Sequence, residues 1–194
     1  MSTLNHYGTL FPTAVVGSMP RPDFVREIVT GGRGEDAARQ AELMNRAVAY
    51  IVSLQEQAGI DIVSDGEWRR ASYIGVIAEL AHGFTLGEEG GRPWTIVTER
   101  LEEKNPGFIA SEVRHLKAVT NRRIKATLPA PALLGERMWD EQKSSAAYPT
   151  RRAFVEACVP VLRCELTLLR DEGVDVVQID DPHLCLLVDD LVRA

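Results

Sequence analysis

The sequence predicts an α/β fold made of repeated strand–helix units. The clearest sign is the apolar run over residues 173–179, which ends at two carboxylates, Asp180 and Asp181. Parallel strands covered by helices on both faces have this pattern, and ligands bind beyond their carboxyl ends. A second sign is that short apolar runs alternate along the chain with longer segments of helical period. Right-handed βαβ units of this kind form either an open doubly wound sheet or a (β/α)8 barrel.

The first part of the chain supplies two strands and the helices between them. Residues 13–18 are predicted to form a short buried strand that ends in a Gly-Ser turn, and a helical segment follows from Asp23. A longer helix is predicted over residues 35–58, with Gly59 at its end. Its buried stripe is predicted to contain Leu43, Ala47, Ile51, Leu54 and Ala58. Residues 60–67 then change from apolar to polar, so their far end is expected to join the same site as the first strand.

A β-hairpin is predicted near residues 84–97, where glycine and proline interrupt threonine-rich runs. We expect this hairpin to be an excursion over the strand ends rather than a second domain. Residues 1–194 are therefore predicted to form a single domain, which suits the chain length. The pattern over residues 112–120 is ambiguous.

The last part of the chain repeats the strand–helix alternation. A third strand is predicted over residues 123–128, and Thr150 is predicted to cap a long helix that Gly173 ends. Pro160 is expected to kink this helix. The fourth strand leads to the two carboxylates, and residues 188–193 are expected to open a further helix.

Composition narrows the class of protein and its location. Apolar residues make up 45% and charged residues 26% of the 194 residues, as in soluble globular proteins. The net charge of −6 argues against a nucleic-acid surface, and no apolar run approaches membrane-spanning length. The N-terminus lacks the basic start and apolar core of a secretory signal. The chain has no CxxC pair or disulfide framework among Cys158, Cys164 and Cys185, so we expect a reducing compartment, the cytoplasm.

Four segments, in this order, resemble the catalytic barrel of the cobalamin-independent methionine synthase (MetE-like) family. They are residues 16–20 (Val-Gly-Ser-Met-Pro), 64–67 (Ser-Asp-Gly-Glu) with Arg70, 125–131 (Lys-Ala-Thr-Leu-Pro-Ala-Pro) and 177–182 (Val-Gln-Ile-Asp-Asp-Pro). The resemblance covers most of the chain. It implies a (β/α)8 TIM-type barrel of which only the first four βα units are present.

The resemblance also implies an activity, that of a 5-methyltetrahydropteroyltriglutamate–homocysteine S-methyltransferase. A methyltetrahydrofolate-type donor would give its methyl group to homocysteine, with zinc and without cobalamin. In that family the Gly-Ser turn holds the substrate carboxylate, while two acids hold its ammonium. The implied substrate-binding residues are therefore Gly17, Ser18, Glu67 and Asp180, with Asp180 also the catalytic candidate. Backbone donors suit an anion and paired carboxylates suit a cation, so the residue types agree with these roles.

Some of these residues have simpler interpretations. Asp181 stands before a proline and could cap the next helix, an alternative that also applies to Asp180. Glu67 could instead form a structural salt bridge with Arg70. Trp94 and Trp139 could stack on a pteridine-like ring or pack at the mouth of the barrel.

The family resemblance places the zinc ligands on later strands, beyond Ala194. Only His183 and Cys185 imitate the family's His-x-Cys pair, and they follow the Asp-Asp-Pro turn directly, one helix too early. A loop histidine and a packed cysteine are the simpler interpretation, so we assign no metal ligand within this chain.

Two alternative functions stay open. The same superfamily contains coenzyme M-type thiol transferases, whose substrates carry no ammonium for Glu67 and Asp180 to bind. The chain could also be a non-catalytic half-barrel that self-associates through its open sheet edges, because unpaired strand edges invite pairing with a second copy.

Overall fold

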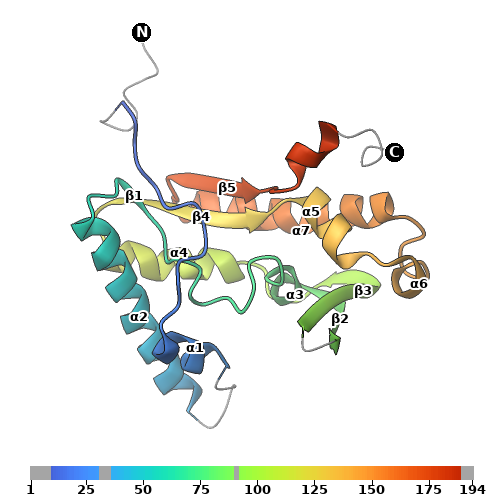
Figure 1. Cartoon of the computed structure of the whole chain (residues 1–194), viewed down its shortest axis with the longest axis horizontal. Helices are drawn as coiled ribbons and strands as arrows, with labels where there is room; N and C mark the ends of the chain where they lie inside the picture. Colours follow the sequence, from blue (N-terminus) through green and yellow to red (C-terminus); the bar gives the residue numbers. More distant parts are fainter. Residues whose placement is uncertain (1–9, 31–35, 90–91, 189–194) are drawn as a thin grey trace.

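The structure is a computed structural model that describes residues 10–30, 36–89 and 92–188. A small parallel sheet lies against helices, and an antiparallel hairpin stands apart from that sheet (Figure 1). The elements in chain order are α1 (Asp23–Thr30), α2 (Ala37–Gln57), β1 (Ile62–Val63), α3 (Ile77–Leu80), β2 (Ala81–Glu89), β3 (Arg92–Glu103), α4 (Phe108–Val119), β4 (Arg123–Pro129), α5 (Pro131–Met138), α6 (Glu141–Ser144), α7 (Arg151–Asp171), β5 (Val176–Asp180) and the 3₁₀-helix η2 (Leu184–Val188).

The described strands of the parallel sheet follow the order β1-β4-β5. Val63 pairs with Ile124 and Pro129 pairs with Asp180, so the carboxyl ends of the strands meet at one edge. Successive strands of the sheet are neighbours, as in a barrel, but the described residues form an open sheet and no closed barrel. The α/β class is confirmed, and the predicted strands over 123–128 and up to Asp180 are present.

The first two predicted strands are much shorter than expected. Of residues 13–18, only Ala14 forms a parallel bridge, to Ile62, and the second strand has two residues instead of the predicted 60–67. Hydrogen bonds from side chains take the place of strand pairing in the first segment. Lys125 and Gln178 donate to the carbonyl of Val16 at 3.0 and 2.7 Å. The first segment is therefore held in place without forming a strand.

Helix α2 begins and ends close to the predicted positions, and it buries part of the predicted stripe: Ala47 and Ile51 are buried, whereas Leu43, Leu54 and Ala58 are exposed. Leu43 and Leu54 are 40% and 38% exposed. The buried residues lie about one position further along: Met44, Ala47, Val48, Ile51, Val52 and Gln55. Gln55 can be buried because its amide donates to the Ser64 carbonyl and accepts from the Ser64 N–H, at 2.8 and 3.0 Å. A search for apolar residues alone misses this polar core position.

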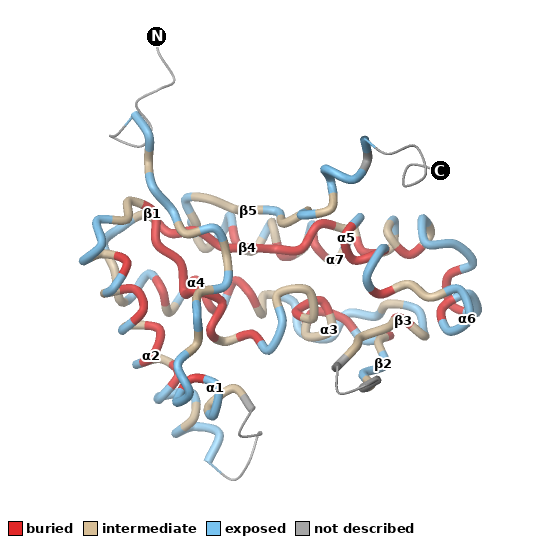
Figure 2. The backbone as a smooth tube through the Cα atoms, viewed as in Figure 1, coloured by how far each residue is buried: buried red, intermediate tan, exposed pale blue. Residues whose placement is uncertain are grey.

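The core lies between the sheet and the helices, where buried positions follow β4 and the inner sides of α2, α4 and α7 (Figure 2). Residues 112–119 of the ambiguous segment belong to helix α4, and Thr120 is its C-cap. Thr150 caps α7 as predicted, since its hydroxyl accepts from the N–H of Ala153, and Pro160 lies inside that helix. No described helix is both long and apolar enough to cross a membrane.

The hairpin is confirmed and is longer than the predicted 84–97, since β2 and β3 pair from Ala81 with Glu103 to Glu89 with Arg92. The register shifts between His82 and Phe84. The expected helix at 188–193 lies outside the described residues except for Val188, the last residue of η2.

Candidate functional site

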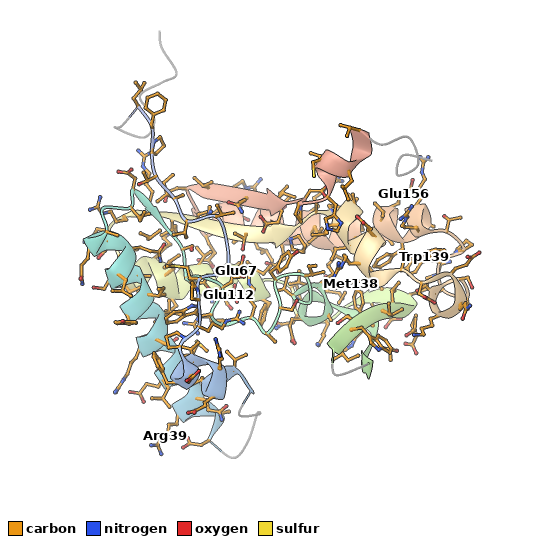
Figure 3. All side chains as sticks on the ribbon, viewed as in Figure 1. Arg39, Glu67, Glu112, Met138, Trp139 and Glu156 are labelled. Carbon is orange, nitrogen blue, oxygen red and sulfur yellow. The ribbon has the colours of Figure 1, made fainter. Side chains whose placement is uncertain are left out.

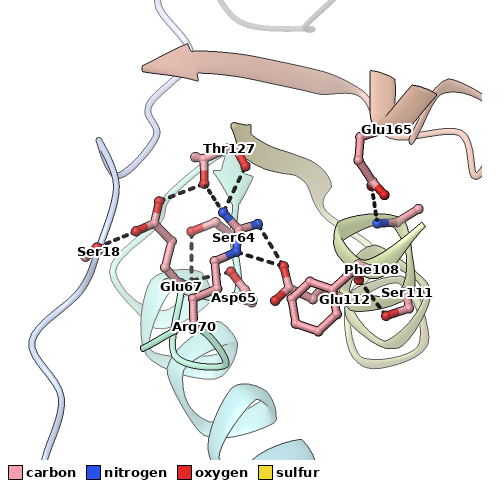
Figure 4. Close-up of polar contacts among 12 residues, drawn as sticks. Ser18, Ser64, Asp65, Glu67, Arg70, Phe108, Ser111, Glu112, Thr127 and Glu165 are labelled. Atoms are coloured by element: carbon pink, nitrogen blue, oxygen red, sulfur yellow. Dashed lines mark hydrogen bonds and ion pairs between the residues drawn. The ribbon is translucent and has the colours of Figure 1, made fainter. Parts of the chain in front are cut away.

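The candidate site lies at the carboxyl ends of β1, β4 and β5, next to the Gly17-Ser18 segment. Glu67 lies on one side of Arg70 and Glu112 on the other (Figure 3 and Figure 4). Glu67 is 3% exposed, although its side chain carries a carboxyl group. Among the described residues other than glycine, Glu67 is the one with a positive φ, 58°. It follows Gly66, whose φ is 66°. Asp65 Oδ1 accepts a hydrogen bond from the Glu67 N–H at 2.9 Å, which helps to hold this unusual turn.

Two hydroxyl groups hold the Glu67 carboxylate from opposite sides (Figure 4). Ser18 donates to Oε2, and Thr127 donates to Oε1 at 2.7 Å. Gly17 lies beside the same carboxylate, since a Cβ added there would come within 3.7 Å of Glu67 Oε1. The structure therefore brings together three of the four predicted substrate-binding residues.

The fourth predicted residue, Asp180, ends β5 and belongs to the same polar cluster. Gln178 Nε2 donates to Asp180 Oδ1 at 2.5 Å. Burial raises the pKa of Asp180, the Gln178 hydrogen bond opposes this shift, and the charge of Glu67 adds to it. Gln178 Nε2 also donates to the Val16 carbonyl at 2.7 Å, which places Asp180 beside the segment that contains Gly17 and Ser18. Asp181 instead lies at the turn into η2, where its carbonyl accepts from the Leu184 N–H at 3.2 Å.

Lys125 is a central residue of the cluster to which the sequence assigned no role. It is 5% exposed, and its ammonium donates to the carbonyls of Val15 and Val16 and to Gln178 Oε1, the last at 2.6 Å. Burial lowers the pKa of Lys125, and the charges of Asp180 and Glu67 oppose this shift. A lysine inside the apolar strand 123–128 was the available signal, because such a cation needs buried partners.

Glu112 is the second residue that the sequence did not identify. Its Oε2 accepts from Arg70 Nε at 3.0 Å and from Arg70 Nη2 at 2.7 Å. Arg70 therefore forms its ion pair with Glu112, and the alternative of a Glu67–Arg70 salt bridge is wrong. Burial raises the pKa of Glu112 to about 7, against the attraction of Arg70 and with a further contribution from Asp65. Glu112 lies within the segment whose structure was ambiguous, so no pattern paired it with Arg70.

His183 and Cys185 each contact a group of the protein in the structure. His183 Nδ1 lies 2.8 Å from Glu136 Oε2, and Cys185 Sγ contacts the Pro182 carbonyl at 3.5 Å. In the described part of the chain, no three or more His, Cys, Asp or Glu residues are grouped so that they could hold a metal ion.

The two tryptophans have different surroundings. Trp139 packs against the core and donates its indole N–H to the Tyr148 carbonyl at 3.0 Å. Trp94 lines a cavity of about 480 Å³ between the hairpin and the loop after β1, which Arg69 and Lys104 also line. Lys143 Nζ lies 4.4 Å from the centre of the Trp94 ring. Of the two, Trp94 is the one beside an open space.

Fold and site together define an α/β protein with a cluster of acids at the carboxyl edge of a parallel sheet. Residues 11–191 match the family described as "Cobalamin-independent synthase, Catalytic domain". The chain belongs to this family.

Similar proteins match about nine tenths of the chain. The chain is 31% identical to a methionine synthase of Sulfolobus acidocaldarius over 91% of this chain and 53% of that protein. It is 26% identical to a 5-methyltetrahydropteroyltriglutamate–homocysteine methyltransferase of Herpetosiphon aurantiacus, over 89% of this chain and 23% of that protein. A B12-independent methionine synthase from Shewanella, solved in complex with selenomethionine, superposes with a TM-score of 0.74 at 25% identity, over 94% of this chain and 55% of that one. The chain thus spans about half the length of the Sulfolobus protein and 23% of the Herpetosiphon protein.

Proposed function

We propose that this chain supplies the amino-acid-binding part of a methyltransferase that moves a methyl group from a methyltetrahydrofolate-type donor to the thiol of homocysteine. The observation that carries the proposal is the gathering of Gly17, Ser18, Glu67 and Asp180 in one cluster, in which Gln178 links Asp180 to the segment before Gly17. The Shewanella relative binds selenomethionine, an amino acid of the product type. That ligand supports the same class of substrate here.

The charges of the cluster favour a ligand with one ammonium group. Glu67 and Asp180 are acidic and Lys125 is basic, so the three side chains sum to one negative charge when all are ionised. An amino acid ammonium would cancel this charge and form charge-assisted hydrogen bonds. The backbone of the Gly17-Ser18 turn would receive the carboxylate. In this scheme the described residues bind and orient the amino acid, so that its thiol is presented away from the clamp.

The methyl donor is proposed to occupy the cavity beside Trp94. An indole ring suits a flat heterocycle, and Arg69 in the same lining suits an anionic donor, whereas the charge of Lys104 is paired with Glu79 at 3.5 Å. Zinc and a cytoplasmic location stay predictions.

Substitution of the two acids tests the proposal. Glu67→Gln and Asp180→Asn should each lower the affinity for L-homocysteine and L-methionine by about ten- to hundredfold, because a hydrogen bond to a charged group contributes roughly 1.5 to 3 kcal/mol. Isothermal titration calorimetry measures the affinity. Glu156→Gln is the matched control, since Glu156 lies on the exposed side of α7 (Figure 3).

The same experiment separates the alternative substrate class. Coenzyme M carries a sulfonate and no ammonium, so its affinity should change little when either acid is neutralised. If both substitutions were silent for the amino acids while coenzyme M bound tightly, the coenzyme M alternative would replace this proposal.

A further inference from the structure

The proposed ammonium clamp needs the Glu67 carboxylate to keep one direction. We propose that Thr127 is a positioning residue for Glu67. Because Arg70 donates a hydrogen bond to the Thr127 hydroxyl oxygen, the single proton of this hydroxyl is donated to Glu67. This inference rests on the proposed function and concerns the same site.

The hydrogen-bonding capacity of the three groups fixes the direction of each bond. A hydroxyl has one proton and two lone pairs, an arginine only donates, and an ionised carboxylate only accepts. Arg70 Nη1 lies 3.1 Å from Thr127 Oγ1, so the threonine oxygen must accept there. Glu67 Oε1 lies 2.7 Å from the same oxygen, so the threonine must donate there. Each group has one role in this arrangement, and no alternative direction of the hydroxyl satisfies all three.

The surroundings of Thr127 make it a rigid donor. It is 5% exposed and lies within β4, where it pairs with Gln178 of β5. Its β-branched side chain has few χ1 rotamers. Arg70 Nη1 also donates to the Thr127 carbonyl at 2.9 Å, and Glu112 holds the other side of the same guanidinium.

The second donor to Glu67 is open to solvent. Ser18 is exposed, whereas Thr127 is 5% exposed, and the segment before Ser18 is held to the sheet by one bridge at Ala14 and by side chains that bind the Val16 carbonyl. When a substrate carboxylate enters beside Ser18, that hydroxyl can turn to it. Thr127 would then be the protein donor that keeps Glu67 aimed at the ammonium, which makes it a specificity element for amino acids.

Three variants test the role of Thr127. Thr127→Val keeps the shape and removes the hydroxyl, whereas Thr127→Ser keeps the hydroxyl. Thr120→Val is the matched control, because the Thr120 hydroxyl also donates to a glutamate, Glu56, at 2.5 Å and away from the site. Thr127→Ala replaces the valine variant where that variant fails to fold.

The first measurement needs no ligand. The ¹³C signal of the Glu67 carboxyl group, followed by NMR in ¹³C-glutamate-labelled protein, should be single and sharp in the wild type, in Thr127→Ser and in Thr120→Val. In Thr127→Val it should shift and broaden, because the carboxylate samples several directions. A Glu67 signal that is identical in Thr127→Val and the wild type overturns the inference.

The second measurement is the affinity for L-methionine by calorimetry. Loss of one hydrogen bond to a charged group corresponds to a decrease of about tenfold or more in Thr127→Val, while Thr127→Ser should restore binding and Thr120→Val should not change it. Equal losses in the valine and serine variants would mean that packing, not the hydroxyl, matters, and would overturn the inference. If the wild type itself binds no amino acid, the proposed function fails, whereas the NMR comparison still decides whether Thr127 positions Glu67.

Discussion

Arg70 and Glu112 form an ion pair of 2.7 Å whose side chains are only 3% and 5% exposed. The pair joins helix α4 to the turn that follows β1, and the same guanidinium contacts Thr127 in β4. Glu112 Oε1 is buried and has no hydrogen-bond partner among the described residues. The Arg70–Glu112 pair is therefore buried and incompletely hydrogen-bonded. Its contribution to the free energy of unfolding depends strongly on both partners being present.

Removing one partner of this pair should destabilise the protein severely. Glu112→Ala leaves the Arg70 charge buried and unpaired, which costs about 3 to 5 kcal/mol for buried pairs of this kind. Urea unfolding followed by circular dichroism gives the free energy of unfolding. Glu156→Ala is the control, because its partner Arg152 is 87% exposed and surface pairs contribute little. Equal effects of the two substitutions would show that the buried pair has no special role.

Glu112 should also make stability depend on pH. Burial raises its pKa from the ordinary 4.5 to about 7, so between these values the folded protein keeps a proton that the unfolded chain has released. The contribution of Glu112 to stability is then highest below about pH 4.5 and falls as the pH rises to about 7. Glu112→Gln removes this titration. The unfolding free energy of the wild type minus that of Glu112→Gln should therefore decrease between about pH 5 and about pH 8. A constant difference over that range contradicts the assignment.

The sequence predicts the elements whose signal is local. The cap at Thr150 and the apolar run up to Asp180 each depend on neighbouring residues, and both are present. The strand at residues 13–18 is absent except for one bridge, because side chains of Lys125 and Gln178 bind the Val16 carbonyl instead of a neighbouring strand. Such long-range bonds leave no periodic pattern in the sequence.

The residues of the candidate site also divide into those that the sequence identifies and those that it does not. Glu67 and Asp180 could be identified because each follows an apolar run that ends at the edge of the sheet. The groups that surround them could not, since Glu112 is 42 positions away from Arg70 and Thr127 is 60 positions away from Glu67. Their positions in the sequence are those of an ordinary helix residue and an ordinary strand residue, and only the fold shows which charges and hydroxyl groups meet.

The 194-residue chain should bind zinc weakly or not at all. His183 and Cys185 offer two donors, whereas protein zinc sites use three or four. Elemental analysis after dialysis against a mild chelator measures the metal content, with Cys164→Ser as a control for loss of a thiol elsewhere. One tightly held zinc per chain that disappears in Cys185→Ser would overturn this expectation and would move the metal site into the described chain.

The 194-residue chain should also self-associate through β5. Among the described strands, β5 bonds only to β4, so its other edge has unpaired N–H and C=O groups. Ile179 in β5 is 53% exposed and Leu184 just after it is 60% exposed, which adds apolar surface at this edge. A charge there should weaken pairing, so Ile179→Lys should shift the sedimentation velocity profile towards monomer. Leu86→Lys is the control, because Leu86 is 72% exposed on the hairpin and lies outside the parallel sheet. A wild-type chain that sediments as one monomeric species at every concentration would show that the edge is protected in another way.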